Sequence, residues 1–291
     1  MSGEYQLPVA ASEGFKDASA YDAYRPSYLP EAVESLLRHL QIADCPNANI
    51  VEIASGTGKF TELLAKRHES YNIHAVEPHR GMASQLVAKQ LPNVKVTEGH
   101  AADMPVEGGW GDACIAAQSF HWFANQEALD EIHRVLKPNA VLGMIWNIED
   151  YNKPKSWKSA TVWGQKLNDW IWSIATDGIP RFRDEKWQGV FEEQQQSNPL
   201  QVIRATLGGK LPKFSLPLGH ERVEWTVWLS EEALWARINT LSQVAVLQGE
   251  QKEAGYRTFK EALQSEDVQR NEKGEIALHG WTYSAWTDRI D

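Results

Sequence analysis

The chain is poor in cysteine, has no long apolar run and carries too little positive charge to balance its acids. Its two cysteines, Cys45 and Cys114, lack the spacing of a metal site, which favours free thiols in a reducing compartment. No apolar run approaches the ~20 residues of a membrane-spanning helix. The net charge of −10 argues against non-specific binding to nucleic acid.

The first residues, MSGEYQLPVA, also lack the charged and apolar regions of a signal peptide. We therefore expect a cytoplasmic protein without a membrane or nucleic-acid partner. The sequence leaves the oligomeric state open. It contains no cluster of acids typical of a divalent-metal site, so we expect no metal.

What the chain does have is a regular alternation of strand-like and helix-period segments between residues 30 and 148. Such alternation predicts an α/β fold with a parallel sheet and helices on both faces. Lys137, Pro138 and Asn139 are expected to end the last of these helices. The expected strands are 50–53, 73–76, 94–97, 113–117 and 141–146.

The texture changes after residue 150. Segment 151–212 is helical in tendency and rich in tryptophan, and we expect it to form an inserted lid. Segment 213–291 has a strand-like run from Val223 to Leu229, a helix from Glu231 capped by Ser230, and a final β element. It should complete the sheet and the pocket, so we expect residues 1–291 to form a single domain with residues 30–148 as its cofactor-binding core.

A glycine turn follows the first expected strand. Gly56 and Gly58 allow a tight turn and a close approach of the backbone to a ligand. Glu77 ends the next strand about 20 residues later, where an acid suits the two hydroxyls of a ribose. These features predict a nucleoside-type cofactor. The third glycine of the dinucleotide fingerprint is replaced by Thr61, which disfavours a nicotinamide-dependent oxidoreductase but leaves it as an alternative.

The run Glu52-Ile53-Ala54-Ser55-Gly56-Thr57-Gly58 resembles motif I of the class I S-adenosylmethionine-dependent methyltransferases. The resemblance extends to the small-molecule branch that includes trans-aconitate methyltransferase-like and "type 11" enzymes, with many fungal members. It implies a Rossmann-like methyltransferase fold: a mostly parallel seven-stranded sheet with an antiparallel C-terminal hairpin and a helical lid insertion. The other matching segments are the N-terminal Phe15, Tyr21, Tyr24, Arg25, Pro26 and Tyr28, and the run Phe120-His121-Trp122-Phe123.

The resemblance implies S-adenosyl-L-methionine as the cofactor. Arg25 is then expected at the methionine carboxylate, Glu77 at the ribose and Met82 at the adenine. Ala54 replaces the first motif glycine and should be tolerated if its φ is negative, whereas His100 replaces the usual acid of the adenine segment. The full expected set is Tyr24, Arg25, Glu52, Ala54, Ser55, Gly56, Gly58, Glu77, Pro78, Met82, His100, Ala101 and Gln118.

His121 is the candidate general base, because histidine suits proton removal near neutral pH. The alternative is that His121 has a structural role, as a helix cap or a backbone hydrogen-bond partner. The expected substrate contacts are Trp122, Trp146, Asn147, Trp157, Trp163 and Arg237. For the tryptophans, packing of the inserted helices is the competing interpretation.

The expected activity is methyl transfer by in-line SN2 displacement to a small, partly apolar organic acceptor, with O-methylation favoured. Besides the oxidoreductase, one further alternative stays open: a protein of this fold that binds S-adenosylmethionine without methylating. Ala54 and His100, which depart from the family pattern, are the reason to keep it.

Overall fold

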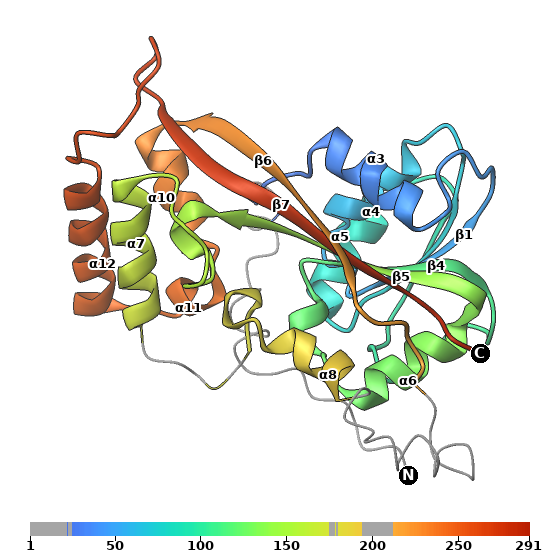
Figure 1. Ribbon diagram of the computed structural model, residues 1–291. Helices are drawn as coiled ribbons and strands as arrows, with labels where there is room; N and C mark the ends of the chain where they lie inside the picture. Colours follow the sequence, from blue (N-terminus) through green and yellow to red (C-terminus); the bar gives the residue numbers. More distant parts are fainter. Residues whose placement is uncertain (1–21, 23–24, 175–177, 179, 194–211) are drawn as a thin grey trace. The chain divides into compact units, whose positions relative to one another are not determined.

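The computed structural model describes residues 22, 25–174, 178, 180–193 and 212–291 (Figure 1). Two compact units are assembled from separate stretches of the chain. The first unit comprises Met1–Leu29, Asn147–Ile179 and Arg222–Tyr283. The second unit comprises Pro30–Trp146, Pro180–Glu221 and Ser284–Asp291.

Four short parallel strands of the sheet belong to the second unit. Ile50 pairs with Ile73 on one side and with Ala113 on the other, and all three are fully or almost fully buried. The four strands are β1 (Asn49–Ile53), β2 (Asn72–Val76), β3 (Val94–Thr97) and β4 (Gly111–Ala117). Strands buried on both faces are expected to be apolar almost throughout, which explains the sequences of β1, β2 and β4, whereas β3 at the edge is only partly buried.

The helices of the second unit follow the predicted apolar spacing. In α6, Ala128, Leu129, Ile132 and Val135 are buried, and the Asn125 side chain caps the helix by accepting from the Ala128 N–H at 2.9 Å. The helical segments are α3 (Pro30–His39), α4 (Lys59–Ala65), α5 (Arg80–Ala88), η1 (Phe120–Trp122), α6 (Gln126–Val135), η3 (Phe182–Asp184), η4 (Lys186–Gln188) and α8 (Gly189–Glu192).

The fifth strand is longer than the sequence predicted. Helix α6 ends at Val135, and β5 (Leu136–Glu149) begins at the next residue, before the expected proline stop. Pairing with β4 jumps from Gly111↔Leu136 to Ala113↔Val141, so Lys137-Pro138-Asn139 bulges out of the ladder. Proline has no N–H to donate and is tolerated at a bulge.

The first unit is mainly helical. Its core contains Trp163, Leu167, Leu234 and Phe259. As predicted, Ser230 caps a helix, since its hydroxyl accepts from the Ala233 N–H at 3.1 Å. The helices are η2 (Asp150–Asn152), α7 (Val162–Ser173), α10 (Glu231–Asn239), α11 (Ser242–Ala245) and α12 (Gly249–Ala262).

The last two strands, β6 (Gly219–Leu229) and β7 (Ile276–Asp288), run side by side (Figure 1). The complete sheet has seven strands in the order β3-β2-β1-β4-β5-β7-β6. It is mostly parallel, with antiparallel strands at the C-terminal side, which confirms the predicted Rossmann-like methyltransferase fold. Among the described helices, none has both the length and the apolar character needed to cross a bilayer.

Candidate functional site

The glycine turn joins β1 to α4 with a left-handed backbone. Gly56 has a φ of 60° and Gly58 a φ of 84°. A Cβ at position 58 would lie 2.3 Å from Leu86 Cδ1, so this position needs glycine for packing as well as for conformation. At position 56 a Cβ would be 3.8 Å from Met82 Sδ, an ordinary contact, so there the backbone conformation alone requires glycine.

Ala54 was expected to be tolerated in the turn if its φ is negative, and its φ is positive. Its φ is 51°, in the left-handed region, whereas tolerance of alanine was expected to depend on a negative φ. A methyl-bearing residue in this conformation is crowded against the following carbonyl, at a cost of roughly 1–2 kcal/mol. Glycine at this position would relieve that strain.

Glu77 follows β2 and closes the turn from the opposite side. Its Oε2 accepts from the Gly56 N–H at 2.8 Å, and its Oε1 accepts from the His79 N–H at 2.7 Å. Each carboxylate oxygen keeps a further lone pair that can accept a hydroxyl. Burial raises the pKa of Glu77 to about 7, partly offset by these two backbone hydrogen bonds.

Glu52 lies within β1 and is completely buried. Burial, together with the charge of Glu77, raises its pKa to about 8, and the nearby Thr61 moderates the shift. Neither oxygen of Glu52 has a partner with hydrogen-bond geometry among the described residues, and the buried hydroxyl of Ser55 lacks one too. Two acids and an orphaned hydroxyl therefore surround the turn.

The other expected cofactor residues of the second unit lie on the segments that follow β2, β3 and β4. Met82 is buried near the start of α5, and His79 Nδ1 accepts its N–H at 3.2 Å. Pro78 is half-buried.

His100 pairs with Asp103 in a short bridge beside the buried Ala101. Gln118, with a φ of 59°, donates its N–H to Ile145 O at 2.8 Å.

His121 is held by a tryptophan. Trp146 Nε1 donates to His121 Nδ1 at 3.1 Å, and both side chains are buried. An indole nitrogen is only ever a donor, so Nδ1 must be the acceptor and the neutral imidazole carries its proton on Nε2. His121 is thus the hydrogen-bond partner of the Trp146 side chain, and the N-caps of η1 and α6 are Ser119 and Asn125 instead.

Trp146 and Trp122 differ in exposure. Trp146 is fully buried, with its ring centroid 4.9 Å from Phe182 and 4.8 Å from Trp187. Trp122 is half-buried, 5.4 Å from the ring of His121. The expectation that Trp146 contacts substrate stays a prediction. In this structure Trp146 packs against Phe182 and Trp187 and orients the ring of His121.

The remaining expected residues belong to the first unit, except Tyr24, which lies outside the described residues. Arg25 Nη1 lies 3.7 Å from Glu149 Oε1, and Arg237 Nε lies 3.8 Å from the same oxygen. Asn147 is tied to the fold, because it donates to Ser27 O at 3.0 Å and accepts from the Thr282 hydroxyl at 2.7 Å.

Two tryptophans of the expected lid pack within the first unit. Trp163 is buried in the helical core. Trp157 is half-buried, and the guanidinium of Arg222 lies 4.0 Å from its ring centroid. The ring of Trp157 also meets Trp281 edge-on at 5.6 Å. These contacts fit the packing interpretation, and contact of Trp157 and Trp163 with substrate stays a prediction.

Sequence reasoning missed Glu149 and Tyr151. Both are buried at the carboxyl end of β5, the edge at which α/β sheets bind ligands. The signal was available, since both residues directly follow the fifth apolar run. Asp150, between them, has a structural role, because its carboxylate accepts from the N–H groups of Ala160 and Thr161 at 3.0 and 3.1 Å.

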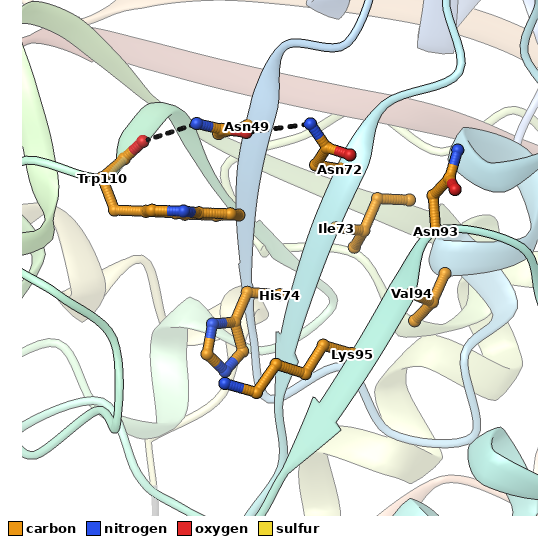
Figure 2. A pocket seen from close by; sticks show the side chains of 8 residues that line it. All are labelled: Asn49, Asn72, Ile73, His74, Asn93, Val94, Lys95 and Trp110. Carbon is orange, nitrogen blue, oxygen red and sulfur yellow. Dashed lines mark hydrogen bonds between the residues drawn. The ribbon is translucent and has the colours of Figure 1, made fainter.

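A shallow hollow of about 510 Å³ lies in the second unit at the amino ends of β1, β2 and β3 (Figure 2). Its asparagines are bonded within the fold: Asn72 donates to Asn49 at 3.1 Å, and Asn49 donates to Trp110 O at 3.2 Å. Ligands bind such sheets at the opposite, carboxyl edge. The hollow is lined by Asn49, Asn72, Ile73, His74, Asn93, Val94, Lys95 and Trp110.

One group of possible metal ligands occurs in the described part of the chain, formed by Asp44, His68 and Glu69. Asp44 and His68 are exposed, and the carboxylate of Glu69 is bound by the guanidinium of Arg67. The three side chains therefore form ion pairs at the surface, in which Arg67 already binds the Glu69 carboxylate.

The residues around the glycine turn fit S-adenosylmethionine. Glu77 has lone pairs for ribose hydroxyls, and the hydroxyl of Ser55 still lacks a partner in the described structure. The turn at Gly56 carries no side chain, so a ligand can approach its backbone. These are the expected donor and acceptor positions of motif I.

Comparison with known proteins identifies the relatives of the chain. Residues 51–144 match the family described as a methyltransferase domain. An uncharacterised methyltransferase of Mycobacterium tuberculosis is 35% identical over 215 residues, 74% of this chain and 70% of the relative. A methyltransferase-like protein of Schizosaccharomyces pombe is 36% identical over 175 residues, and the match spans 60% of this chain and 63% of that relative.

Among solved structures, the YcgJ protein of Bacillus subtilis shares the fold. Its TM-score is 0.52 at 14% identity, and the match covers 88% of this chain and 98% of that one. At this level of identity the likeness concerns the fold alone.

Proposed function

This chain belongs to the class I S-adenosylmethionine-dependent methyltransferases, with S-adenosylmethionine as cofactor, and from that premise we propose that it methylates a small, partly apolar organic molecule. The observation that carries the proposal is the Glu77 carboxylate, bonded to the Gly56 N–H at 2.8 Å. That bond supports the proposal, because it holds a carboxylate that can accept ribose hydroxyls beside the glycine turn. Oxygen is the favoured acceptor atom, and we propose the cytoplasm as the location.

The bound cofactor supplies a methyl group on a positively charged sulfur, which is already electrophilic. The protein's task is then to bind, orient and exclude water, and orientation is worth roughly 7–11 kcal/mol in favourable cases. Glu77 holds the ribose, the turn at Gly56 receives the cofactor, and Met82 packs near the same turn. His121, fixed by Trp146, offers an N–H at Nε2 to orient an acceptor oxygen.

Residues 151–212 are proposed as the lid that shields the reacting groups from water. Arg25 as a ligand of the methionine carboxylate also remains a proposal. With S-adenosylmethionine bound, the chemistry would be in-line SN2 displacement, in which the acceptor would take the methyl group from the sulfur. It needs a proton acceptor only if the acceptor is not already ionised.

Calorimetric binding of S-adenosylmethionine, S-adenosylhomocysteine and NAD tests the proposal. We expect binding of the first two and none of NAD, with Glu77→Ala lowering both affinities at least tenfold through the lost ribose contacts. Tight NAD binding alone would establish the oxidoreductase alternative. Binding without formation of S-adenosylhomocysteine from any acceptor would support a non-methylating protein.

A further inference from the structure

Three buried aromatic rings pack together at the donor that holds His121. The ring centroid of Trp146 lies 4.9 Å from that of Phe182 and 4.8 Å from that of Trp187. Phe182 and Trp187 also meet each other, with stacked rings 6.1 Å apart. Each ring of this aromatic triad therefore contacts the other two, at separations in which aromatic rings attract one another.

Trp187 also contacts the short helix η1 that carries His121. Its ring meets Phe120, the residue before His121, edge-on at 6.2 Å. Phe120 is itself fully buried and stacks on Phe191 at 5.5 Å. Trp187 thus packs on both sides of the hydrogen bond to His121: on the tryptophan that donates it, and on the helix that carries its acceptor.

Phe182 and Trp187 come from a part of the chain that was expected to form a lid. They lie on η3 and η4, within residues 180–193, whereas His121 and Trp146 lie on η1 and β5. All four residues nevertheless belong to the second unit. The side chains of Phe182 and Trp187 are buried in that unit, so residues 180–193 form part of its packed interior.

The hydrogen bond to His121 requires one orientation of the Trp146 indole. A tryptophan side chain turns about two bonds, and only the settings that aim Nε1 at His121 Nδ1 keep the 3.1 Å contact. A turned indole would present carbon atoms to Nδ1, and the imidazole could then take either neutral tautomer. Close packing on two further rings opposes such a turn, because the space that the indole would need is filled.

We propose that Phe182 and Trp187 are positioning residues for methyl transfer, which hold the Trp146 indole in the orientation that fixes the tautomer of His121. Neither residue needs to touch the cofactor or the acceptor. Their effect passes through Trp146 to the N–H at Nε2 of His121, which orients the acceptor oxygen. This inference rests on the proposed function, because the role of His121 is part of it.

Two identical substitutions in the same segment form the central test. Phe182→Leu loosens the aromatic triad. Phe191→Leu, the matched control, removes a buried ring whose ring contacts among the described residues are with Phe120 and Phe214. Leucine keeps both positions apolar, so both variants should fold, with similar decreases in Tm. Only Phe182→Leu should disturb the ring of His121.

The first readout is the tautomer of His121, from proton–nitrogen correlation NMR spectra of the imidazole rings. The signals of His121 are assigned by their absence from His121→Gln, and spectra are taken at about pH 8.5, where histidine is ordinarily neutral. Wild type and Phe191→Leu should carry the proton on Nε2. Phe182→Leu should show a mixture of tautomers, and Trp146→Phe, which lacks the donor, should show the largest change.

The second readout is methyl transfer to para-nitrophenol, measured as S-adenosylhomocysteine formation. Phe182→Leu should lower kcat up to about tenfold, with S-adenosylmethionine affinity by calorimetry unchanged. Trp187→Phe keeps a ring at its position and should retain more of the rate than Trp187→Leu, whereas Phe191→Leu should keep the wild-type kcat. Adding Phe182→Leu to His121→Gln should lower kcat no further, because the group that it positions is already gone.

Three results would overturn the inference. One is a wild-type His121 with its proton on Nδ1. Another is a His121 spectrum that stays unchanged in Phe182→Leu, or that changes equally in Phe182→Leu and Phe191→Leu. The third is a loss of kcat from Phe182→Leu that persists in full in the His121→Gln background. The tautomer is read without turnover, so failure of methyl transfer with the expected spectra would count against the proposed function alone.

Discussion

Trp146 donates its indole N–H to Nδ1 of His121 across 3.1 Å, and this bond fixes the tautomer of a histidine that follows β4. With Nδ1 accepting, neutral His121 presents an N–H donor at Nε2. A general base acting through Nε2 would need the other tautomer, with the proton on Nδ1. That proton would then face the indole N–H of Trp146, so two donors would point at each other. The bond therefore favours orientation of the acceptor over removal of its proton.

Replacing His121 separates the two roles. Glutamine places an amide N–H near the position of Nε2, so His121→Gln should keep roughly a tenth or more of wild-type kcat/KM, whereas His121→Leu should lose about a further tenfold. The measurement is kcat/KM for both variants across a pH series. Equal losses in both, together with disappearance of an ionisation from the wild-type pH profile, would show that His121 is a general base.

Cofactor affinity should rise with pH because of Glu77. Burial raises the pKa of this carboxyl to about 7, and ribose hydroxyls donate best to its ionised form. Below the pKa, each unit by which the pH falls should therefore weaken S-adenosylmethionine binding up to about tenfold. Above the pKa, the affinity should stay constant. Calorimetry over about pH 5.5 to 8.5 measures this dependence.

Glu77→Gln is the control for that dependence. The amide keeps the size of the side chain but cannot ionise, so its cofactor affinity should be low and nearly independent of pH. A Glu77→Gln variant with the same pH dependence as the wild type would assign the titration to another group, with Glu52 next to be tested.

Glu52 should make the protein less stable as pH rises. Its folded-state pKa of about 8 lies above the usual value of 4.5, so between these two values the folded state holds a proton that the unfolded state has released. The contribution of Glu52 to the free energy of unfolding is therefore fully present below pH 4.5. As the pH rises from there to about 8, this contribution decreases by up to about 1.4 kcal/mol per pH unit.

Urea unfolding at about pH 5 and about pH 7 tests this effect in wild type and Glu52→Gln. The glutamine cannot ionise, so the difference in unfolding free energy between the two proteins should shift in favour of Glu52→Gln as pH rises. A difference that stays constant over this interval would mean that Glu52 is ionised in the folded protein.

The sequence predicted the fold because its signals are local. The strands around Ile50, Ile73 and Ala113 are short apolar runs, and the Ser230 cap needs a partner only three residues away. The start of β5 escaped prediction because pairing with β4 outweighs the helix-stop signal of Lys137-Pro138-Asn139. Local propensity is a weak prior that tertiary contacts override.

The candidate site was predicted where it follows a motif and missed where it depends on distant residues. Glu77 and Gly56 belong to a recognisable pattern, and the structure brings them together. Glu149, Tyr151 and Arg237 come from β5, the segment after it and α10, which are separated by most of the first unit's chain. No periodic sequence pattern links residues so far apart in the chain, so only the tertiary structure shows that they lie close together.

Ala54→Gly should stabilise the protein. At a φ of 51°, alanine is strained, and glycine removes that strain while adding some freedom to the unfolded chain. The net gain should be about 0.5–1 kcal/mol in urea unfolding. Ala254→Gly, within helix α12, is the matched control and should lose about 1 kcal/mol. A destabilised Ala54→Gly would show that the turn relaxes without cost around alanine.

Gly56→Val should abolish cofactor binding without unfolding the protein. A Cβ has room at this position, so the effect arises from the backbone, because valine strongly disfavours a φ of 60°. The turn must then shift, which moves the Gly56 N–H away from Glu77 and the ribose acceptor away from its place. We expect S-adenosylmethionine affinity to fall at least a hundredfold, or about 2.7 kcal/mol.

Gly109→Val separates this effect from strain in general. Gly109 also has a positive φ, 68°, and a Cβ there would meet nothing within 4 Å. Both variants should therefore lose a similar amount of stability, measured by urea unfolding, while Gly109→Val binds the cofactor normally. Because the two substitutions share the same backbone penalty, a loss of binding confined to Gly56→Val can come only from the place of Gly56 beside Glu77. Equal cofactor affinity in both would mean that the turn has a structural role alone.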